Sequence, residues 1–325
     1  CIIAALKTPL AHSELGATRW IKLGSISFQA AEPIKAAIII FFAYYVSYWG
    51  LNRWYNQLLA CLLAIALLGF LFFFSNNLST VIVLFCICAV IILSSVKKPD
   101  LYWYFLIGLA LVIIAAIFVT VYLLMHQGAE NFRFVRIRAW LHPEEYAADE
   151  GLQAMQARYA IGAGGFWGKG LGQSLIKFKL SYSYNDFILA IICEELGVFG
   201  VIVMMTLFGY LLYRIYKIAQ NAWDIEGKVL AIGVFTQIAL QLLINVMVVT
   251  SVIPTTGVTL PFFSAGGTSV VFLLAELGMV LNVDKYAKER RFFEEAERHV
   301  AQMEQRGGIG AAGWRRRLDS ARTHR

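Results

Sequence analysis

Apolar residues along this chain come in long blocks separated by short polar connectors. The blocks have roughly 17 to 25 residues, the length that an α-helix needs to cross a hydrocarbon core about 30 Å thick. We read seven blocks as membrane-spanning helices, at about residues 33–50, 58–74, 78–96, 101–125, 186–213, 229–250 and 268–282. The expected fold is therefore all-α, a polytopic bundle of membrane helices with a long loop at about residues 126–185.

The composition agrees with this pattern. The chain is 59% hydrophobic and 15% charged, with a mean hydropathy of +0.65, which lies outside the range of ordinary soluble domains. The net charge of +7 does not indicate nucleic acid, because the basic residues fall mainly in connectors and in the tail. Four of the five cysteines lie inside apolar blocks and predict packing, not a disulfide framework.

Basic residues predict the orientation in the membrane. The short connectors carry Arg53, Lys97, Lys98, Arg214, Lys217 and Lys228. If these connectors face the cytoplasm, the long loop lies outside and the tail at residues 283–325 lies inside. The membrane domain then covers residues 1–282. The first residues, Cys1–Leu6, read as the end of a helix whose start is missing.

Polar residues inside the apolar blocks are the first candidates for function, because they are costly in lipid unless they face other helices or a water-filled cavity. Glu32 and Lys35 are three residues apart at the start of the first block, with Gln29 one turn earlier. They form either an interfacial ion pair or the wall of a cavity for a charged headgroup. Gln237, Gln241 and Asn245 share one face of a later helix, which must point into the bundle, either for interhelical hydrogen bonding or as the lining of a cavity.

An aspartate and two glycine-rich loops stand at the predicted outer surface. Asp186 opens a span directly after the long loop, as a helix cap or as a general base facing a phosphorylated lipid. The runs 161–172 and 254–269 are rich in glycine but lack the pattern of a P-loop. Their glycines permit tight turns, so the two loops are expected to form a structured roof over a cavity.

These motifs together resemble the SEDS family of RodA, FtsW and SpoVE. The resemblance rests on Ala160–Gly172, Asn185–Ile188, Glu194–Gly197 and the loop Pro254–Ser269, preceded by Gly16–Trp20 and Gln29–Lys35. The Pro-x-Thr-Gly form at Pro254 is closer to the FtsW and SpoVE branch. The resemblance implies a ten-helix fold, of which this chain holds the last seven helices.

The resemblance also implies an activity and its residues. Such a protein polymerises lipid II into glycan strands at the outer face of the bacterial cytoplasmic membrane, with Asp186 as the catalytic residue. The implied substrate-binding and cavity residues are Glu32, Lys35, Gln29, Arg133, Arg136, Lys169, Glu194, Gln241, Asn245, Ser264, Gly266 and Gly267. A divalent cation, Mg²⁺ or Mn²⁺, is a candidate cofactor, with Asp186 as its candidate ligand. The implied partners are a class B penicillin-binding transpeptidase and other division or elongation proteins.

The chain departs from the family pattern at several positions. Asn77 replaces an aspartate, Ser181–Asn185 replaces a stretch that usually carries a carboxylate and an imidazole, and Ala265 replaces a tyrosine. Two further functions stay open at this point, a lipid II flippase and a division or elongation scaffold without chemistry. A flippase would tolerate loss of Asp186, and a scaffold would also tolerate loss of Glu32 and Lys35.

Overall fold

The computed structural model describes residues 11–14, 17–23, 26–75, 78–96, 132–146, 150–175, 186–264, 267–305 and 313–315. Five helices in this part of the chain are long and apolar enough to cross a membrane: α3 (Trp54–Ser75), α4 (Leu78–Ser95), α8 (Ile188–Asn221), α9 (Ile225–Val249) and α10 (Gly267–Gln305). The predicted all-α membrane bundle is confirmed.

The other two predicted spans have different outcomes. The block at about 33–50 forms helix α2 (Ala31–Trp49), which lies in the bundle but is not among the five because charged Glu32 and Lys35 occupy its first turns. The block at 101–125 lies outside the described residues, as do Cys1–Leu6 and Lys97 and Lys98.

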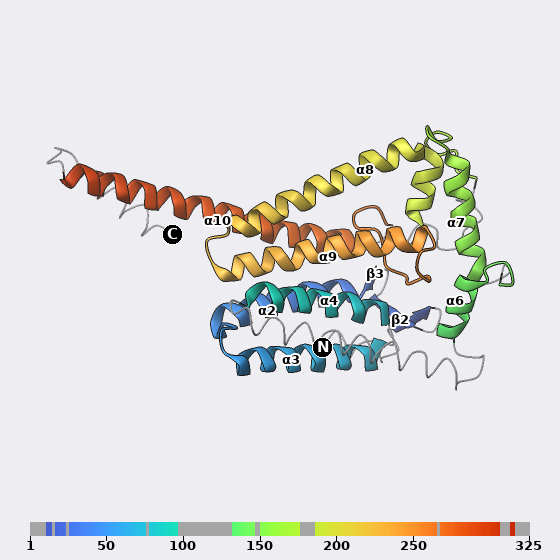
Figure 1. Ribbon diagram of the computed structural model, residues 1–325, viewed down its shortest axis with the longest axis horizontal. Helices are drawn as coiled ribbons and strands as arrows, with labels where there is room; N and C mark the ends of the chain where they lie inside the picture. Colours follow the sequence, from blue (N-terminus) through green and yellow to red (C-terminus); the bar gives the residue numbers. More distant parts are fainter. Residues whose placement is uncertain are drawn as a thin grey trace.

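Helix α9 is the centre of the bundle. It packs against α2, α4, α8 and α10, and Figure 1 shows it between these helices. Half of the residues in its apolar 18-residue stretch are buried, compared with 28% of those in the corresponding stretch of α3. The peripheral helices instead expose apolar side chains, including Leu62 and Ile65 on α3 and Ile202 and Leu207 on α8. These exposed faces are suited to lipid contact, since lipid tails are as apolar as the side chains themselves.

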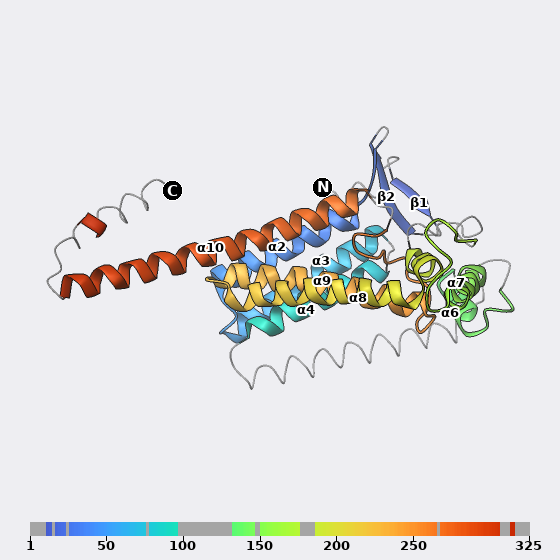
Figure 2. The same cartoon turned by 90° about the horizontal axis from the view of Figure 1, so that it is seen from above.

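The connectors separate into two ends of the bundle. The α2–α3 and α8–α9 connections lie at one end, where Arg53 and Lys228 are found. At the opposite end, α6 (Phe132–Leu141) and α7 (Glu150–Gly164) cross the bundle, near the 250–264 loop (Figures 1 and 2). The predicted long loop therefore contains helices of its own and covers one end.

The sequence did not predict a small sheet, which lies at the same end as α6 and α7. Its strands are β1 (Ala11–Glu14), β2 (Ala17–Leu23) and β3 (Ile26–Gln29), paired antiparallel in the order β1-β2-β3. The strands are too short for the apolar-block criterion, which selects segments of membrane-spanning length. Strand β3 ends at Gln29, so the sheet leads directly into the first turn of α2.

Helix α10 extends far beyond the predicted span. Its 39 residues run from Gly267 to Gln305 without interruption, so the first part of the predicted tail continues the last span as one helix (Figure 2). The predicted boundary between residues 282 and 283 lies inside this helix. The guanidinium of Arg291 donates a hydrogen bond to the Asn221 carbonyl (2.7 Å), which fixes α10 against the end of α8.

Candidate active site

A pocket opens where the start of α2 meets α4, α9 and the 250–264 loop. The space between its walls, including the part that is open to solvent, is about 310 Å³. Its lining comes from these four elements and from the end of strand β3, and consists of Gln29, Ala31, Glu32, Lys35, Thr80, Val83, Gln241, Gly257, Val258 and Thr259. Four of the predicted cavity residues, Gln29, Glu32, Lys35 and Gln241, thus lie in one pocket.

The ion pair in this pocket is almost completely buried. Lys35 Nζ lies 2.7 Å from Glu32 Oε1, and each residue is 3% exposed. Because the residues are one helical turn apart, the backbone of α2 holds them together. An interfacial anchor would be exposed to water and headgroups, so the burial favours the cavity interpretation. Removal of either partner would leave a buried charge without its counterion, which is strongly destabilising.

The polar stripe on α9 points into the bundle, as predicted. Gln237, Gln241 and Asn245 are all less than 5% exposed. Gln237 donates a hydrogen bond to Glu276 on α10 (2.7 Å), and Gln241 lines the pocket. The stripe therefore serves both purposes considered from the sequence, with interhelical bonding at one position and cavity lining at another.

Asn245 connects the pocket to Asp186. Its side-chain amide donates hydrogen bonds to the Asp186 carbonyl and to the Val258 carbonyl, both at 2.9 Å. Val258 lines the pocket, so a single buried side chain joins the pocket wall to the backbone of the predicted catalytic residue. Asp186 itself is half-buried, and the cap position of α8 is occupied by Phe187. Asp186 therefore directly precedes the cap position, and its roles as a helix cap and as a general base both stay predictions.

The first glycine-rich loop is inserted into a break in α8. At Gly197 the backbone leaves the helical conformation, with φ 66° and ψ −168°. The N–H groups of Lys169 and Gly170 donate to the carbonyls of Glu194 and Glu195 (2.9 Å each). In return, the N–H groups of Val198 and Phe199 donate to the carbonyls of Gly165 and Phe166 (3.0 and 3.1 Å). The loop thus satisfies the backbone groups that the break removes from the helix.

Three glycines make this insertion sterically feasible. An added Cβ at Gly164 would lie 1.9 Å from the Cys193 carbonyl oxygen, and one at Gly168 would lie 2.2 Å from the Glu195 oxygen. At Gly197 the Cβ would lie 2.4 Å from the nitrogen of Gly168. These contacts involve backbone atoms and cannot relax by a side-chain rotation. The close approach of two backbones therefore explains why the run is glycine-rich.

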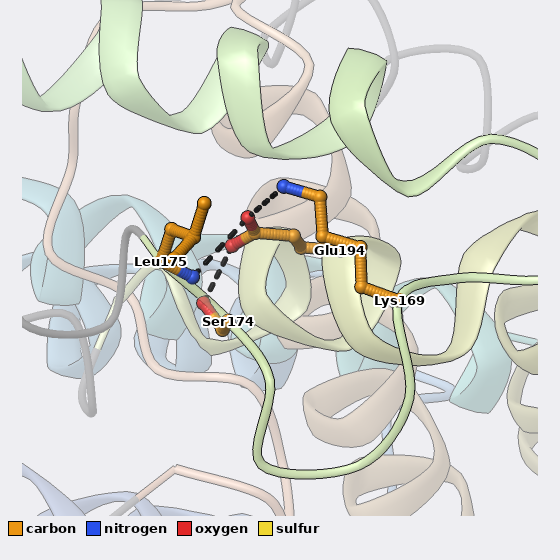
Figure 3. A network of polar contacts seen from close by, with 4 residues as sticks. All are labelled: Lys169, Ser174, Leu175 and Glu194. Atoms are coloured by element: carbon orange, nitrogen blue, oxygen red, sulfur yellow. Dashed lines mark hydrogen bonds and ion pairs between the residues drawn. The ribbon is translucent and has the colours of Figure 1, made fainter.

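Glu194 holds the inserted loop through its side chain (Figure 3). Its carboxylate accepts hydrogen bonds from Lys169 Nζ (2.7 Å), Ser174 Oγ (2.5 Å) and the Leu175 N–H (3.3 Å). The glutamate is completely buried, whereas the Lys169 side chain is 32% exposed. Both residues were predicted to line the substrate cavity, but neither lines the pocket. The structure places them in the loop-to-helix connection.

We expect Glu194→Gln to lower the free energy of unfolding by about 2 kcal/mol, because an ionised acceptor forms hydrogen bonds that a neutral amide oxygen does not match. Thermal unfolding of the purified protein in detergent measures this change. Glu195→Gln is the matched control, since the described part of the chain shows no side-chain bond to that carboxylate. Equal losses of stability in the two variants would contradict the assigned role of Glu194.

The remaining predicted residues lie around this end of the bundle. Arg133 and Arg136 are on α6, where Arg136 is half-buried and the side chain of Arg133 is not described. Ser264 is buried in the second loop, Gly267 is the first residue of α10, and Gly266 is outside the described residues. No three His, Cys, Asp or Glu within the described ranges are grouped to hold a metal ion.

Two contacts that the sequence did not indicate fix the position of the outer helices. Trp140 Nε1 on α6 donates to the Ser251 carbonyl (2.8 Å), and Arg158 Nε on α7 donates to the Ser251 hydroxyl (3.0 Å). Ser251 follows the end of α9 and has a positive φ of 59°. Both helices of the predicted long loop are thereby attached to the central helix. The sequence did not indicate these contacts because a single serine and its two partners form no alternating or apolar pattern.

Comparisons with known proteins give one consistent family. A model described as a cell cycle protein family of FtsW, RodA and SpoVE matches residues 1–289. Stage V sporulation protein E of Bacillus subtilis (strain 168) is 37% identical over 277 residues, which cover 84% of this chain and 73% of that protein. A probable peptidoglycan glycosyltransferase FtsW of Trichlorobacter lovleyi is 34% identical over 276 residues, covering 82% and 68%.

Solved structures share the fold. A chain of a peptidoglycan synthase complex, studied for its coordination of polymerization and crosslinking, superimposes with a TM-score of 0.70 at 25% identity and covers 87% of this chain and 78% of its own length. The rod shape determining protein RodA of Thermus thermophilus superimposes with a TM-score of 0.58 at 23% identity, covering 87% and 75%. The second likeness concerns the fold alone.

Proposed function

Because this chain belongs to the FtsW, RodA and SpoVE family of cell cycle proteins, we propose that it is a peptidoglycan glycosyltransferase that polymerises lipid II into glycan strands. Relatives more than 30% identical to it are named as probable peptidoglycan glycosyltransferases, and a chain of a peptidoglycan synthase complex shares its fold. A protein with several membrane spans suits this activity, because the substrate carries an undecaprenyl chain.

One observation supports this function more than any other. Asn245 holds the backbone of Asp186 and the pocket-lining residue Val258 with one buried amide. The backbone of the half-buried Asp186 is thereby tied to the wall of a pocket that also contains the amine of Lys35. A general base must be positioned within hydrogen-bonding reach of the proton that it removes. We propose Asp186 as this base, at the end of the bundle where α6 and α7 lie.

The proposed reaction is a displacement at the anomeric carbon of the donor sugar. Asp186 takes the proton from the 4-hydroxyl of the acceptor, whose oxygen forms the new glycosidic bond. The bond from the anomeric carbon to the pyrophosphate oxygen breaks, and undecaprenyl pyrophosphate leaves with the electron pair. Asp186 releases its proton to solvent after each transfer. The residue is thus a catalytic base and is not consumed.

The leaving pyrophosphate requires positive charge. Arg133 and Arg136 on α6 are proposed to supply it, because the planar guanidinium group is suited to phosphate recognition. A Mg²⁺ or Mn²⁺ ion would be held by Asp186 together with the substrate, since magnesium is often bound by one or two carboxylates and by phosphate oxygens. Such an ion would neutralise charge on the pyrophosphate.

The proposed orientation follows from the distribution of basic residues. Arg53, Arg214, Lys217 and Lys228 lie at or near the end of the bundle opposite the pocket. Under the positive-inside rule this end faces the cytoplasm, together with the distal part of α10. The pocket and Asp186 then face outward, where glycan strands are assembled. A class B penicillin-binding transpeptidase is the proposed partner, which would crosslink the strands that this protein makes.

The test is polymerisation of labelled lipid II by the full-length protein with its partner transpeptidase, with Asn245→Ala as the diagnostic variant. We expect glycan strands from the wild type. The variant should lose roughly 100-fold in kcat, since a small misplacement of catalytic groups has costs of this size. KM for lipid II should change little, because the pocket side chains remain. Asn282→Ala, at an exposed position of α10, is the control.

Two outcomes would contradict the proposal. Lipid II scrambling across vesicles without any polymer, in both wild type and variant, would favour the flippase. Full polymerisation by Asn245→Ala would remove Asn245 as a positioning residue for Asp186.

A further inference from the structure

A second carboxylate lies deep in the bundle, next to the ion pair of the pocket. Glu276 is on α10, roughly 14 Å along the helix from Gly267, and is 1% exposed. It accepts a hydrogen bond from Gln237 and is close enough to Lys35 and Glu32 to interact electrostatically with both. The sequence pattern does not indicate this residue, since an isolated glutamate inside a span has no partner at helical spacing.

The charges of this cluster do not balance. Glu32 and Glu276 supply two carboxylates, whereas Lys35 is the only base that interacts with them in the described part of the chain. If all three groups were ionised, a net negative charge would be buried in the membrane domain. Such a charge is costly in a low-dielectric interior unless it is paired or protonated. Helix α9 adds the amide of Gln237 but no charge to the cluster.

The unused oxygen atoms indicate where a proton belongs. The Gln237 amide donates to Glu276 Oε2 at 2.7 Å. The other oxygen of each residue, Gln237 Oε1 and Glu276 Oε1, has no hydrogen-bond partner among the described residues although both are buried. An ionised carboxylate only accepts hydrogen bonds and cannot satisfy an amide oxygen. A carboxylic acid can donate to that oxygen, so an acid and an amide can pair through two hydrogen bonds.

Glu32 is the less suitable place for this proton. Its Oε1 atom accepts a hydrogen bond from the ammonium of Lys35 at 2.7 Å, so a cation in direct contact compensates for the burial of this carboxylate. The partner of Glu276 is a neutral amide, which offers less compensation for a buried charge. The two carboxylates therefore occupy unequal environments, and the proton is assigned to the one without a cation in hydrogen-bonding contact.

We infer that Glu276 is a proton-binding site inside the membrane domain, and that its proton keeps Lys35 paired with Glu32 at the pocket wall. Loss of the proton would create a second carboxylate competing for the same ammonium group. Lys35 would then be drawn from Glu32 toward Glu276, away from the pocket that it lines together with Gln29 and Gln241. The consequence for the pocket depends on the proposed function, whereas the protonation of Glu276 does not.

Infrared difference spectroscopy of the full-length protein in nanodiscs tests the site directly. We expect the carbonyl band of a protonated carboxylic acid at neutral pH, and we expect this band to be lost in Glu276→Gln. Gln237→Leu removes the amide partner and should shift the band to higher frequency, because the acid loses its hydrogen bonds. If the wild type and Glu276→Gln have the same carboxylic acid bands at neutral pH, Glu276 is ionised and the inference is wrong.

A pH series of thermal unfolding gives a second measurement that is independent of enzymatic activity. Glu276→Gln carries a permanent neutral amide, so its Tm should change less than that of the wild type as the pH rises from about 4 to above neutral. Over this range the Tm of the wild type should fall, because the carboxyl group is ionised in the unfolded chain but holds its proton in the folded protein, so unfolding releases a proton. Parallel pH profiles for the two proteins would overturn the proton site. If the infrared and unfolding results are as expected but the protein makes no glycan, the proposed function is wrong and the proton site at Glu276 still holds.

Discussion

Asp186→Asn should abolish glycan polymerisation while leaving the fold intact. The asparagine side chain has nearly the same shape but cannot take a proton from the acceptor hydroxyl. General-base catalysis contributes about 10²- to 10⁴-fold, so a loss of this size or greater is expected. Asn245 binds the backbone carbonyl of residue 186, not its side chain, so the connection to the pocket is preserved in the variant. Single-turnover polymerisation of labelled lipid II measures the effect.

Asp284→Asn provides the matched control for this variant. Asp284 is on α10 far from the pocket, in an ion pair with Lys288 (2.6 Å) whose lysine is largely exposed. An exposed pair of this kind contributes little to stability, so both activity and Tm should stay close to the wild type. Substantial polymerisation by Asp186→Asn would show that another group accepts the proton, and the assignment of Asp186 would have to be abandoned.

Gly197→Ala should be the most damaging substitution for the fold. The new methyl group would lie 2.4 Å from two backbone atoms of the inserted loop, and φ of 66° is strained for any L-residue. Overpacking costs about 1–3 kcal/mol, and a non-glycine residue in this backbone conformation, φ 66° with ψ −168°, costs about 1–3 kcal/mol. We therefore expect a loss of about 3 kcal/mol or more, measured as a lower Tm and a low yield of folded protein in detergent.

Gly209→Ala tests the same change on the same helix without the loop. No atom lies within 4 Å of the position where its Cβ would be built. Since alanine is favoured over glycine inside a helix by about 1 kcal/mol, this variant should be as stable as the wild type or slightly more stable. If Gly197→Ala and Gly209→Ala had similar Tm values, the inserted loop would not depend on the close approach described for Gly197.

The bundle was predictable because membrane spans have a simple physical signature. Their length and uniform apolar character identified α3, α4 and α9 within a few residues, whereas α8 continues to Asn221, well past its predicted end at about residue 213. The polar stripe on α9 predicted which face is buried. The small sheet was missed, since strands of this size carry no comparable signal. The break at Gly197 was missed for a related reason, because its apolar neighbours continue the hydrophobic block through the break.

The site was predictable in its components but not in its connections. Gln29, Glu32, Lys35 and Gln241 were expected to line a cavity, and they lie in one pocket. The bridge from Asn245 to Asp186 joins residues far apart in the chain, and no local spacing encodes it. Glu194 and Lys169 were expected at the substrate but bond to each other, because the loop insertion that brings them together depends on glycine packing. The roles of Asp186 and the α6 arginines remain predictions.

Helix α10 has a mechanical consequence. At a rise of about 1.5 Å per residue, its 39 residues form a rod of roughly 58 Å, almost twice the thickness of the hydrocarbon core. The rod begins just after the loop that contributes Val258 to the pocket and ends well beyond the bundle (Figure 2). An unbroken helix transmits a tilt from one end to the other. A force on the distal end of α10 would therefore also move the loop that lines the pocket.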